Sequence, residues 1–356
     1  MGQYLDLYKN AGTFISLNRK PDFNNLLKVL KREKPDRPTL FEFFLNDELY
    51  KKLTCNITYD ETDEFFKLKR TLDAYSIMGY DYVTLHGSDF ALYSDRRQDA
   101  TKASISLNDG AVIFDRESFE KYRWADPADY DYSRLVKLGE YMPEGMNLIV
   151  YGNGGILENV ISLVGYENLC YLIMDDPELV TEIFAHVGTR FVKYYEICSG
   201  YDSVGALISN DDWGFNSQTM LSVEDMKKYV IPWHKKIAET IHRSGKPAIL
   251  HSCGRLTDVM DDIIDDIKYD AKHSYEDKII PVEEAYETYG SRIAIFGGLD
   301  VNFVCSATPE QIYNRASSIL RQTGSKGGYA LGSGNSIPYY VPDENYFAMA
   351  AAALFE

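Results

Sequence analysis

Residues 222–254 read SVEDMKKYVIPWHKKIAETIHRSGKPAILHSCG, and this stretch holds one complete unit of an α/β fold. A helical pattern begins at Ser222 and ends at Ser244-Gly245, where glycine is a common helix stop. The short apolar run at residues 247–250 then predicts a buried strand. His251-Ser252-Cys253-Gly254 follows at the carboxyl end of that strand. The stretch therefore predicts a helix, a strand and a loop that carries an imidazole and a thiol.

The same alternation of apolar runs and helical patterns extends along the chain. About eight strand-like runs, mostly separated by helices, predict a parallel sheet closed as a (β/α)8 TIM barrel. The alternative is an open doubly wound sheet, but no Gly-x-Gly-x-x-Gly follows the first strand. The apolar runs end near Phe44, Leu85, Val150, Ile208, Leu250, Ala271, Phe296 and Leu331. The helical patterns cover residues 63–78, 132–140, 177–198, 222–243, 256–267, 281–289 and 308–322.

We expect residues 1–356 to form a single barrel domain, because neither a domain boundary nor an internal repeat is visible. Residues from about 91 to 124 interrupt the alternation. Within them, residues 104–114 read SISLNDGAVIF, which predicts a hairpin over the Asn-Asp-Gly turn. The sequence therefore predicts an inserted hairpin near the barrel mouth, in the position of a lid.

Charge and cysteine content limit the classes of partner. The chain has 54 acidic and 37 basic residues, a formal net charge of −17, which disfavours binding to nucleic acid or to an anionic membrane. No apolar run approaches the roughly 20 residues that a membrane span needs. The five cysteines have no Cys-x-x-Cys spacing, and no secretory signal pattern follows Met1, so we expect a cytoplasmic protein.

Polar residues gather where the predicted strands end. Barrel enzymes carry their chemistry on the loops after the carboxyl ends of the strands, so this concentration predicts an active site there. The residues at these positions are Glu42, Asn46, His86 to Asp89, Tyr151 to Gly155, Asn210 to Trp213, His251 to Cys253, His273 with Glu276, Asp300, and Gly332 to Ser336.

His251 and Cys253 are the strongest candidates for metal ligands. Histidine nitrogen and cysteine sulfur are ligands that Zn²⁺ prefers, although a satisfied histidine and a packed thiol are the alternatives. Glu276 is a further candidate ligand, whereas we expect His273 to be structural. Asp211-Asp212 has two interpretations. The pair caps the following segment, or it orients His251 or supplies an oxygen ligand.

The remaining candidates come from the other strand ends. We expect Asp89, Asp212 and Ser333 to be catalytic, with a turn-forming role as the alternative for Asp89. The predicted substrate-binding residues are Asn46, Tyr151, Asn153 and Trp213. No role is assigned to His86, His186, His234 or His242.

With these residues placed, the chain resembles the uroporphyrinogen decarboxylase superfamily over most of its length. This resemblance implies a (β/α)8 barrel, in agreement with the alternation of strands and helices. The matching segments are KPDRP at 34–38, WADPADY at 124–130, DDWG at 211–214, LS at 221–222, IPW at 231–233, LHSCG at 250–254, GGLD at 297–300 and VPDEN at 341–345.

Two branches of that superfamily offer different activities. Its decarboxylases bind the many carboxylates of their substrate with an arginine-rich segment after the first strand, but residues 41–46 read FEFFLN. Ser333 also stands where those enzymes have a histidine. Ser88-Asp89 does resemble their catalytic Ser-Asp pair. A decarboxylase would use Asp89 as its catalytic acid group without a metal. The missing arginines and the serine at position 333 disfavour this activity despite the match at Ser88-Asp89.

The other branch contains cobalamin- or coenzyme-M-linked methyltransferases, which bind zinc through His-x-Cys and a later cysteine. His251 and Cys253 match the first two ligands, and the later cysteine would fall near Ser333. The resemblance implies that a carboxylate, Glu276 or Asp212, completes the zinc site. It also implies a small methylated substrate, a corrinoid carried on a separate protein, and a homodimer. A non-catalytic barrel that binds a corrinoid or a methylated ligand is the third alternative.

Overall fold

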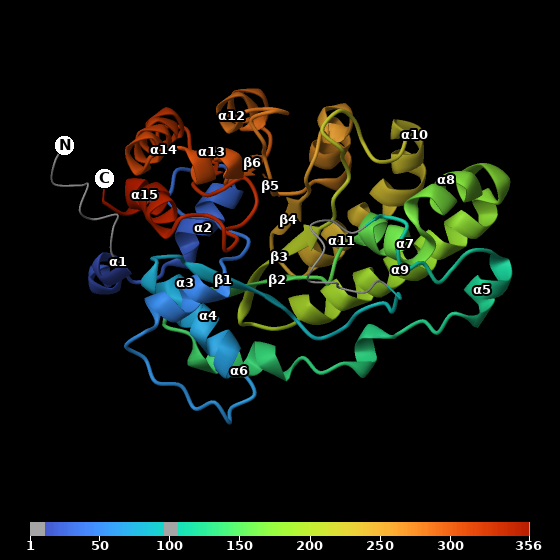
Figure 1. The fold of residues 1–356 in the computed structure, drawn as a ribbon, viewed down its shortest axis with the longest axis horizontal. Coiled ribbons are helices and arrows are strands. Elements are labelled where there is room, and N and C mark those ends of the chain that lie inside the picture. The colour runs from blue at the N-terminus through green and yellow to red at the C-terminus, as the bar shows by residue number, and fades with distance from the viewer. Residues whose placement is uncertain (1–10, 96–105, 356) are drawn as a thin grey trace.

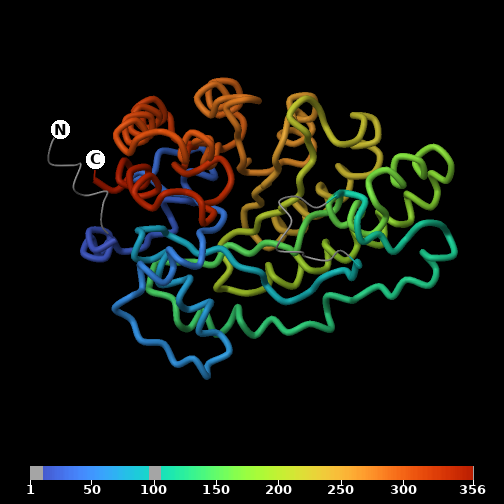
Figure 2. Tube along the Cα trace, viewed as in Figure 1, coloured from blue at the N-terminus to red at the C-terminus, as the bar shows by residue number. Residues whose placement is uncertain are grey.

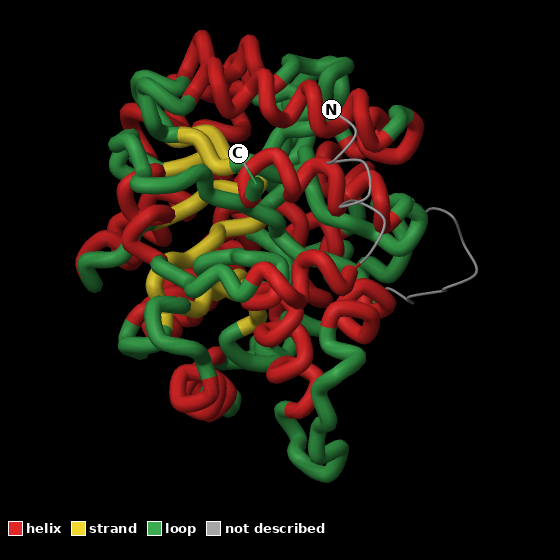
Figure 3. The backbone as a smooth tube through the Cα atoms, turned by 90° about the vertical axis from the view of Figure 1, so that its left-hand side faces the viewer, coloured by secondary structure: helices red, strands yellow, loops and turns green. Residues whose placement is uncertain are grey.

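The computed structural model describes residues 11–95 and 106–355. Within these ranges, seven parallel strands form one curved sheet, and each strand lies beside the next along the chain (Figure 1). Helices surround the strands, which therefore form the inner layer (Figure 3). The strands are β1 Tyr82–His86, β2 Asn147–Tyr151, β3 Val204–Asn210, β4 Ala248–His251, β5 Ala271–His273, β6 Ala294–Phe296 and β7 Tyr329–Ala330.

The helices between the strands confirm the predicted alternation, except that the predicted helix at residues 256–267 consists of a 3₁₀ turn, Thr257–Val259, and a π-helical segment, Asp262–Ile267. At three of the predicted starts, Asp176, Ser222 and Thr308, the side chain accepts a hydrogen bond from the backbone N–H three residues later. The helices are α1 Ala11–Leu17, α2 Phe23–Leu30, α3 Asp47–Leu53, α4 Phe66–Ile77, α5 Arg116–Lys121, α6 Ser133–Tyr141, α7 Ile156–Val164, α8 Tyr166–Asp175, α9 Pro177–Ser199, α10 Val223–Asp225, α11 Ile231–Arg243, α12 Val282–Tyr289, α13 Val301–Ser306, α14 Pro309–Thr323 and α15 Asp343–Leu354.

The predicted helix at residues 222–243 contains an irregular turn. A π-helical turn, Met226–Val230, lies between α10 and α11. Pro232 stands in the first turn of α11 and has no N–H, so the regular series of helical hydrogen bonds is interrupted there.

An eighth segment, residues 39–43, lies between β7 and β1 and completes the barrel. Two backbone hydrogen bonds, of 2.7 and 2.9 Å, join this segment to Leu331 in a single parallel bridge. On its other side, the hydroxyls of Tyr82 and Thr84 bond to its backbone. The predicted TIM barrel is confirmed, with the first predicted strand reduced to one bridge.

The insertion at residues 91–124 differs from the predicted hairpin. Part of it, residues 96–105, lies outside the described residues and includes the start of the predicted first arm. Residues 111–114 are not a strand, because the N–H groups of Val112 and Ile113 both donate to the Leu163 carbonyl at the end of α7. The prediction of a second strand is wrong because a helix end accepts the hydrogen bonds that a partner strand would have accepted.

Buried hydrophobic side chains among the described residues form one continuous cluster. The first and last described helices, α1 and α15, lie side by side (Figure 2), and the rings of Phe14 and Phe347 are 4.8 Å apart. No single helix in the described ranges is long and apolar enough to cross a membrane. The pair α7 and α8 reaches that length and composition only when both are taken together across a 92° bend.

Candidate metal and catalytic site

The carboxyl ends of β3, β4 and β5 bring the predicted site residues together. In the parallel ladders, Asn210 pairs with His251, and His251 pairs with His273. Because side chains alternate between the two faces along a strand, residues in register share one face of the sheet. Phe43 contacts His251 at a ring-centroid distance of 4.5 Å, and Phe41 contacts His273 at 4.8 Å. This face is therefore the interior of the barrel.

Asp212, His251 and Cys253 form the cluster that could hold a metal ion. One ligand atom from each residue lies within 4.8 Å of the others. His251 Nε2 lies 3.9 Å from Cys253 Sγ, and the imidazole is buried. His251 is the last residue of β4, and Asp212 and Cys253 lie in the loops after β3 and β4. The three side chains meet because the two strands are neighbours in the sheet.

The chemistry of this donor set fits zinc. In a tetrahedral zinc site with bonds of about 2.0–2.3 Å, neighbouring ligand atoms are roughly 3.5 Å apart. The imidazole nitrogen and the sulfur are therefore nearly in place, and the carboxylate needs only a small movement. Three protein ligands leave one of four positions open, which is typical of catalytic rather than structural zinc sites. The metal itself stays a prediction.

The surroundings of Cys253 orient its sulfur. Ser274 Oγ donates to Sγ at 3.3 Å, and Asn335 Nδ2 donates to it at 3.4 Å. The Cys253 N–H donates to Asp212 Oδ1 at 2.8 Å, which fixes the carboxylate beside the thiol. Burial raises the pKa of the Cys253 thiol, and the neighbouring Asp212 carboxylate raises it further. Without a metal the thiol therefore keeps its proton at neutral pH, and a bound cation would displace that proton.

The two neighbouring aspartates have different roles. Asp211 is fully buried, and its carboxylate accepts from the N–H groups of Leu157 and Glu158 at the start of α7. It also accepts from Trp213 Nε1 at 3.0 Å and lies 2.8 Å from His234 Nε2. Asp211 thus caps a helix, but that helix precedes β3 rather than following it. Asp212 alone lies in the cluster with His251 and Cys253.

Ser333, a predicted catalytic residue, lies behind the cluster. Its N–H and its hydroxyl each donate to the carboxyl group of Glu42 at 2.6 Å. Burial raises the pKa of Glu42 to about 8, and the two hydrogen bonds from Ser333 partly oppose that shift. The Ser333 carbonyl oxygen lies 3.3 Å from His273 Nε2. In this arrangement Ser333 supports the buried imidazoles and contacts no ligand atom of the cluster.

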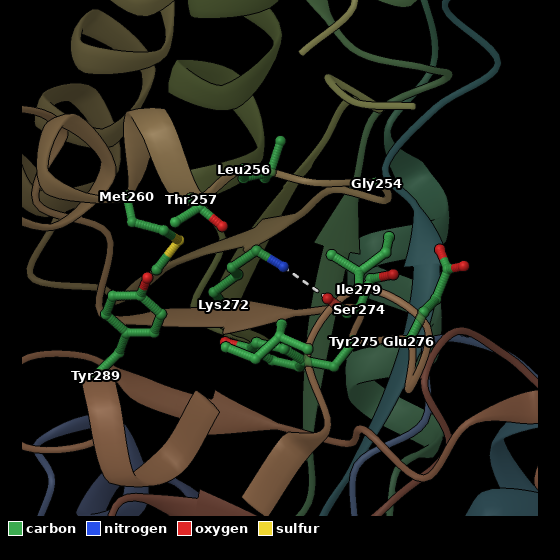
Figure 4. Close-up of a pocket in the computed structure, with 11 residues that line it drawn as sticks. Gly254, Leu256, Thr257, Met260, Lys272, Ser274, Tyr275, Glu276, Ile279 and Tyr289 are labelled. Carbon is green, nitrogen blue, oxygen red and sulfur yellow. Dashed lines mark hydrogen bonds between the residues drawn. The ribbon is translucent and has the colours of Figure 1, made fainter. Parts of the chain in front are cut away.

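A buried lysine lies next to the cluster, in the wall of a pocket (Figure 4). Lys272 Nζ donates to the Ser274 carbonyl at 2.6 Å and more weakly to the Ser252 carbonyl at 3.3 Å. Burial lowers the pKa of Lys272 to about 8, opposed by the negative charges nearby. Apolar side chains such as Met260 and Tyr289 form the far wall of the pocket. Lys272 therefore places a positive charge behind the loops that carry Asp212 and Cys253.

Ser274 has a strained backbone, with φ of +82° in the left-handed region. A residue other than glycine in such a conformation costs about 1–3 kcal/mol, and the surrounding contacts must maintain it. Here the Lys272 amine binds the Ser274 carbonyl. This conformation allows the Ser274 hydroxyl to reach the sulfur of Cys253.

Trp213, predicted to bind substrate, lies inside the protein. Its side chain is 0% exposed, and the indole packs edge-on against His234 with ring centroids 4.6 Å apart. The indole N–H donates to Asp211, so both its apolar and its polar surface are used inside the protein. Trp213 therefore has no exposed surface in this structure, and its contact with a substrate stays a prediction.

Asn46 also has a structural role. Its side-chain oxygen caps α3 by accepting from the Leu49 N–H at 3.0 Å, and its amide nitrogen donates to the Ile337 carbonyl at 3.3 Å. Both polar groups of this side chain are therefore occupied within the protein. Each group makes one hydrogen bond here and keeps a second N–H or lone pair, so the predicted contact with substrate stays a prediction.

Tyr151 and Asn153 lie at and just after the end of β2. The Tyr151 ring contacts Phe43 at 4.7 Å and His86 at 4.1 Å, so it lies on the interior face near His251. Burial raises the pKa of Tyr151 to about 12. Asn153 is exposed, and its carbonyl accepts from Asn159. Tyr151 is the better placed of the two for a substrate in the barrel mouth.

Asp89 and Glu276 lie outside the three-residue cluster. The Asp89 side chain is 83% exposed and forms an ion pair of 2.6 Å with Arg134. Glu276 is half-buried, and burial raises its pKa. It lines a hollow that Asn335 also lines. Asp212 therefore has the position that sequence reasoning offered to either carboxylate.

Sequence reasoning placed Glu42 and His86 at the strand ends without giving either a role, and it missed Lys272 as part of this region. The His86 ring packs against Tyr151 at an interplanar angle of 50°, and its Nδ1 is buried without a hydrogen-bond partner among the described residues. A signal existed for each of them, since all three are polar residues within or just after apolar runs. Their partners come from other strands, which local sequence patterns do not reveal.

Comparisons with known proteins agree with the fold. A family model described as Uroporphyrinogen decarboxylase (URO-D) matches residues 113–354. A solved structure described as a methyltransferase from Methanosarcina mazei superposes with a TM-score of 0.65 at 16% identity, over 92% of this chain and 97% of that chain. At this identity the likeness shows the fold alone.

Curated relatives match smaller parts of the chain. A methylated-thiol–coenzyme M methyltransferase of Methanosarcina mazei is 28% identical over 191 residues, which are 53% of this chain and 48% of that protein. A uroporphyrinogen decarboxylase of Anaeromyxobacter sp. is 30% identical over 128 residues, 36% of this chain and 35% of that protein. The matches thus span less than half of the length of each relative.

Proposed function

The chain belongs to the uroporphyrinogen decarboxylase family. Within this family, we propose that it is a zinc-dependent methyltransferase. It would move a methyl group between a small methylated substrate and a corrinoid carried on a separate protein. The observation that carries the proposal is the cluster of Asp212, His251 and Cys253 at the ends of β3 and β4. The partial match to a relative named as a methyltransferase supports the same activity.

His251 Nε2, Cys253 Sγ and a carboxylate oxygen of Asp212 would hold the metal. When bound, zinc supplies a Lewis acid that lowers the pKa of a thiol or polarises a methyl ether or amine. The hydrogen bonds from Ser274 and Asn335 stabilise the sulfur as a thiolate, because donors favour the charged form. Lys272 adds positive charge behind the same loops.

The substrate would enter through the hollow at the barrel mouth. Phe44, Glu276, Asn335 and Tyr340 line this hollow, and Asn335 also contacts the sulfur of Cys253. A ligand held there would lie beside the open side of the metal cluster. The corrinoid protein would then cover the mouth, so that the methyl group is aligned between donor and acceptor.

The geometry does not favour the decarboxylase alternative. That reaction would need Asp89 in the cavity, whereas its carboxylate is exposed and paired with Arg134. Residues 41–46 contain no arginine for a substrate with many carboxylates. Incubation with uroporphyrinogen tests this directly. Formation of coproporphyrinogen would replace our proposal with the decarboxylase, and ligand binding without any turnover would indicate a non-catalytic barrel.

Metal analysis tests the proposed site. Protein purified without added zinc should contain zinc in the wild type, and His251→Ala, Cys253→Ala and Asp212→Ala should each reduce its content. Cys170→Ala is the matched control, because Cys170 is an exposed thiol on α8. Equal metal content in the wild type and the three cluster variants would contradict the proposal. Transfer of methyl groups from methylated thiols, ethers or amines to reduced cobalamin would then identify the substrate class.

A further inference from the structure

Two buried imidazoles, those of His251 and His273, lie end to end on the neighbouring strands β4 and β5. Their Nδ1 atoms are 2.8 Å apart. The other nitrogen of each ring faces a different group. His273 Nε2 lies 3.3 Å from the carbonyl oxygen of Ser333, and His251 Nε2 lies 3.9 Å from the sulfur of Cys253.

Ser333, His273 and His251 form a row of hydrogen-bonding groups. The chemistry of their contacts determines which atom in each contact is the donor. A carbonyl oxygen only accepts, so His273 Nε2 must carry a proton and donate it to Ser333. A neutral imidazole has one N–H, so the Nδ1 of His273 is then an acceptor. His251 Nδ1 must therefore be the donor in the contact between the two rings. The one remaining nitrogen, His251 Nε2, has a lone pair and points at the metal cluster.

The environment of His273 keeps this ring neutral. Its side chain is 0% exposed, and the ring of Phe41 lies against it at 4.8 Å. No carboxylate forms an ion pair with His273 among the described residues, while the buried amine of Lys272 is its neighbour in the chain. An imidazolium without a counterion would pay a large desolvation cost in this interior.

The far end of the row is held rigidly. Glu42 accepts both the N–H and the hydroxyl of Ser333, and the Ser333 carbonyl also accepts from the Gly298 N–H at 2.9 Å. Gly297, with φ of +66°, lies against the same carbonyl. A Cβ atom at Gly297 would come within 2.2 Å of the Ser333 oxygen and within 3.0 Å of His273 Nε2. The backbone is therefore shaped to bring this carbonyl to the imidazole.

We propose that His273 is a positioning residue that fixes His251 in its Nδ1–H form, so that Nε2 is the metal-binding atom. The metal half of this inference rests on the proposed function, whereas the protonation of the two rings does not. The row runs from Glu42 through the Ser333 backbone and His273 to His251. It would supply the partner that a metal-bound histidine needs at its second nitrogen.

Nitrogen NMR of the metal-free wild-type protein, labelled with ¹⁵N-histidine and assigned with single-histidine variants, tests the inference. We expect a protonated Nδ1 and an unprotonated Nε2 for His251, and the reverse for His273. A proton on His251 Nε2 in the folded, metal-free protein would overturn the inference. This measurement needs no zinc, so it stands even if metal analysis contradicts the proposed function.

Two substitutions at the same position separate positioning from packing. In His273→Asn the amide oxygen can still accept from His251 Nδ1, whereas in His273→Leu no acceptor remains. We expect His273→Leu to weaken zinc binding about 10–100-fold, the usual effect of losing a partner behind a metal ligand. His273→Asn should recover most of that loss. Zinc affinity would be measured by competition with a chelator.

His242→Asn is the control for these variants, because His242 lies on the outer helix α11, away from the cluster, and pairs there with Asp270, which precedes β5. It should bind zinc like the wild type. Equal zinc affinities for folded His273→Leu and the wild type would overturn the inference. If His273→Leu does not fold, the Asn variant and the NMR of the wild type still decide it, because both report on the acceptor at His251 Nδ1.

Discussion

Asp211 and Asp212 are neighbours in the chain, yet one belongs to a closed network and the other to an open one. The Asp211 carboxylate accepts from three N–H groups and also lies against His234. Asp212 is only partly buried, and it accepts from the Cys253 N–H in the cluster with His251. Both regions contain an aspartate beside a histidine, so residue type alone does not distinguish them.

The difference lies in how completely the polar atoms are satisfied. A buried carboxylate whose hydrogen bonds are all made inside the protein stabilises the fold and has no capacity left for a ligand. The cluster around Asp212 instead converges on a point where a nitrogen, a sulfur and an oxygen face one another within 4.8 Å. We therefore interpret Asp211 as a residue that stabilises the fold, and we keep the proposed metal site for the cluster around Asp212.

Substitution of Asp211 should give the largest effect. We expect Asp211→Ala to lower the free energy of unfolding by about 3–5 kcal/mol, because it leaves buried donors without an acceptor. Urea unfolding followed by circular dichroism measures this. The matched variant Asp212→Ala should cost less than about 1 kcal/mol. Equal losses in the two variants would remove the distinction between the regions.

Zinc affinity should show the opposite order. Asp212→Ala should weaken zinc binding at least about 100-fold, more than the usual effect of losing an indirect partner. Asp211→Asn is the comparison variant, since it keeps an oxygen acceptor for part of its network and should change zinc affinity only slightly. Chelator competition measures both. A normal zinc affinity for Asp212→Ala would exclude this carboxylate as a ligand.

The pH dependence of zinc binding should sharpen the assignment of Cys253. Burial raises the pKa of this thiol, so zinc must displace its proton, and affinity should rise roughly tenfold per pH unit. The suitable window is about pH 5.5–7. Burial lowers the pKa of His251 to about 4 and that of Lys272 to about 8, so neither changes charge much there. Affinity independent of pH would argue against a thiolate ligand.

The smallest effect is expected from Asn335. Its amide donates to the sulfur of Cys253, and loss of this hydrogen bond should cost roughly 1 kcal/mol, or about fivefold in zinc affinity. Asn335→Ala should show this loss without a change in urea midpoint, because Asn335 is only partly buried. An unchanged zinc affinity would indicate that the Asn335 amide does not stabilise the zinc site and only lines the substrate hollow.

The fold was predictable from the sequence because its signals are local. The alternation of apolar runs with helical patterns, and helix N-caps such as Asp176 and Thr308, depend on residues only a few positions apart. The hairpin prediction at residues 104–114 failed where a distant group, the Leu163 carbonyl, competed for the backbone. Turn patterns report on local preference and not on which partner is nearest in space.

The candidate site was likewise predictable only where its signals are local in the sequence. His251 and Cys253 follow one strand, so their proximity could be expected, whereas the choice of Asp212 over Glu276 depends on β3 and β4 being neighbours. The burial of Trp213 was not predictable, because an aromatic side chain after a strand can turn into the core as easily as into the mouth. The role of His273 depends on the Ser333 backbone, 60 residues away in the chain.

The closing bridge at residues 39–43 sets where the barrel should loosen first over time. Between β3 and β4 an unbroken ladder protects the amides, whereas one bridge to Leu331 and the hydroxyls of Tyr82 and Thr84 hold this segment. Regions with fewer backbone hydrogen bonds open at lower free energy. In deuterium oxide we expect the amide protons of Phe41 and Leu331 to exchange well before those of Ile208. The barrel would then open locally at this segment, while the strands that carry the proposed metal site stay paired.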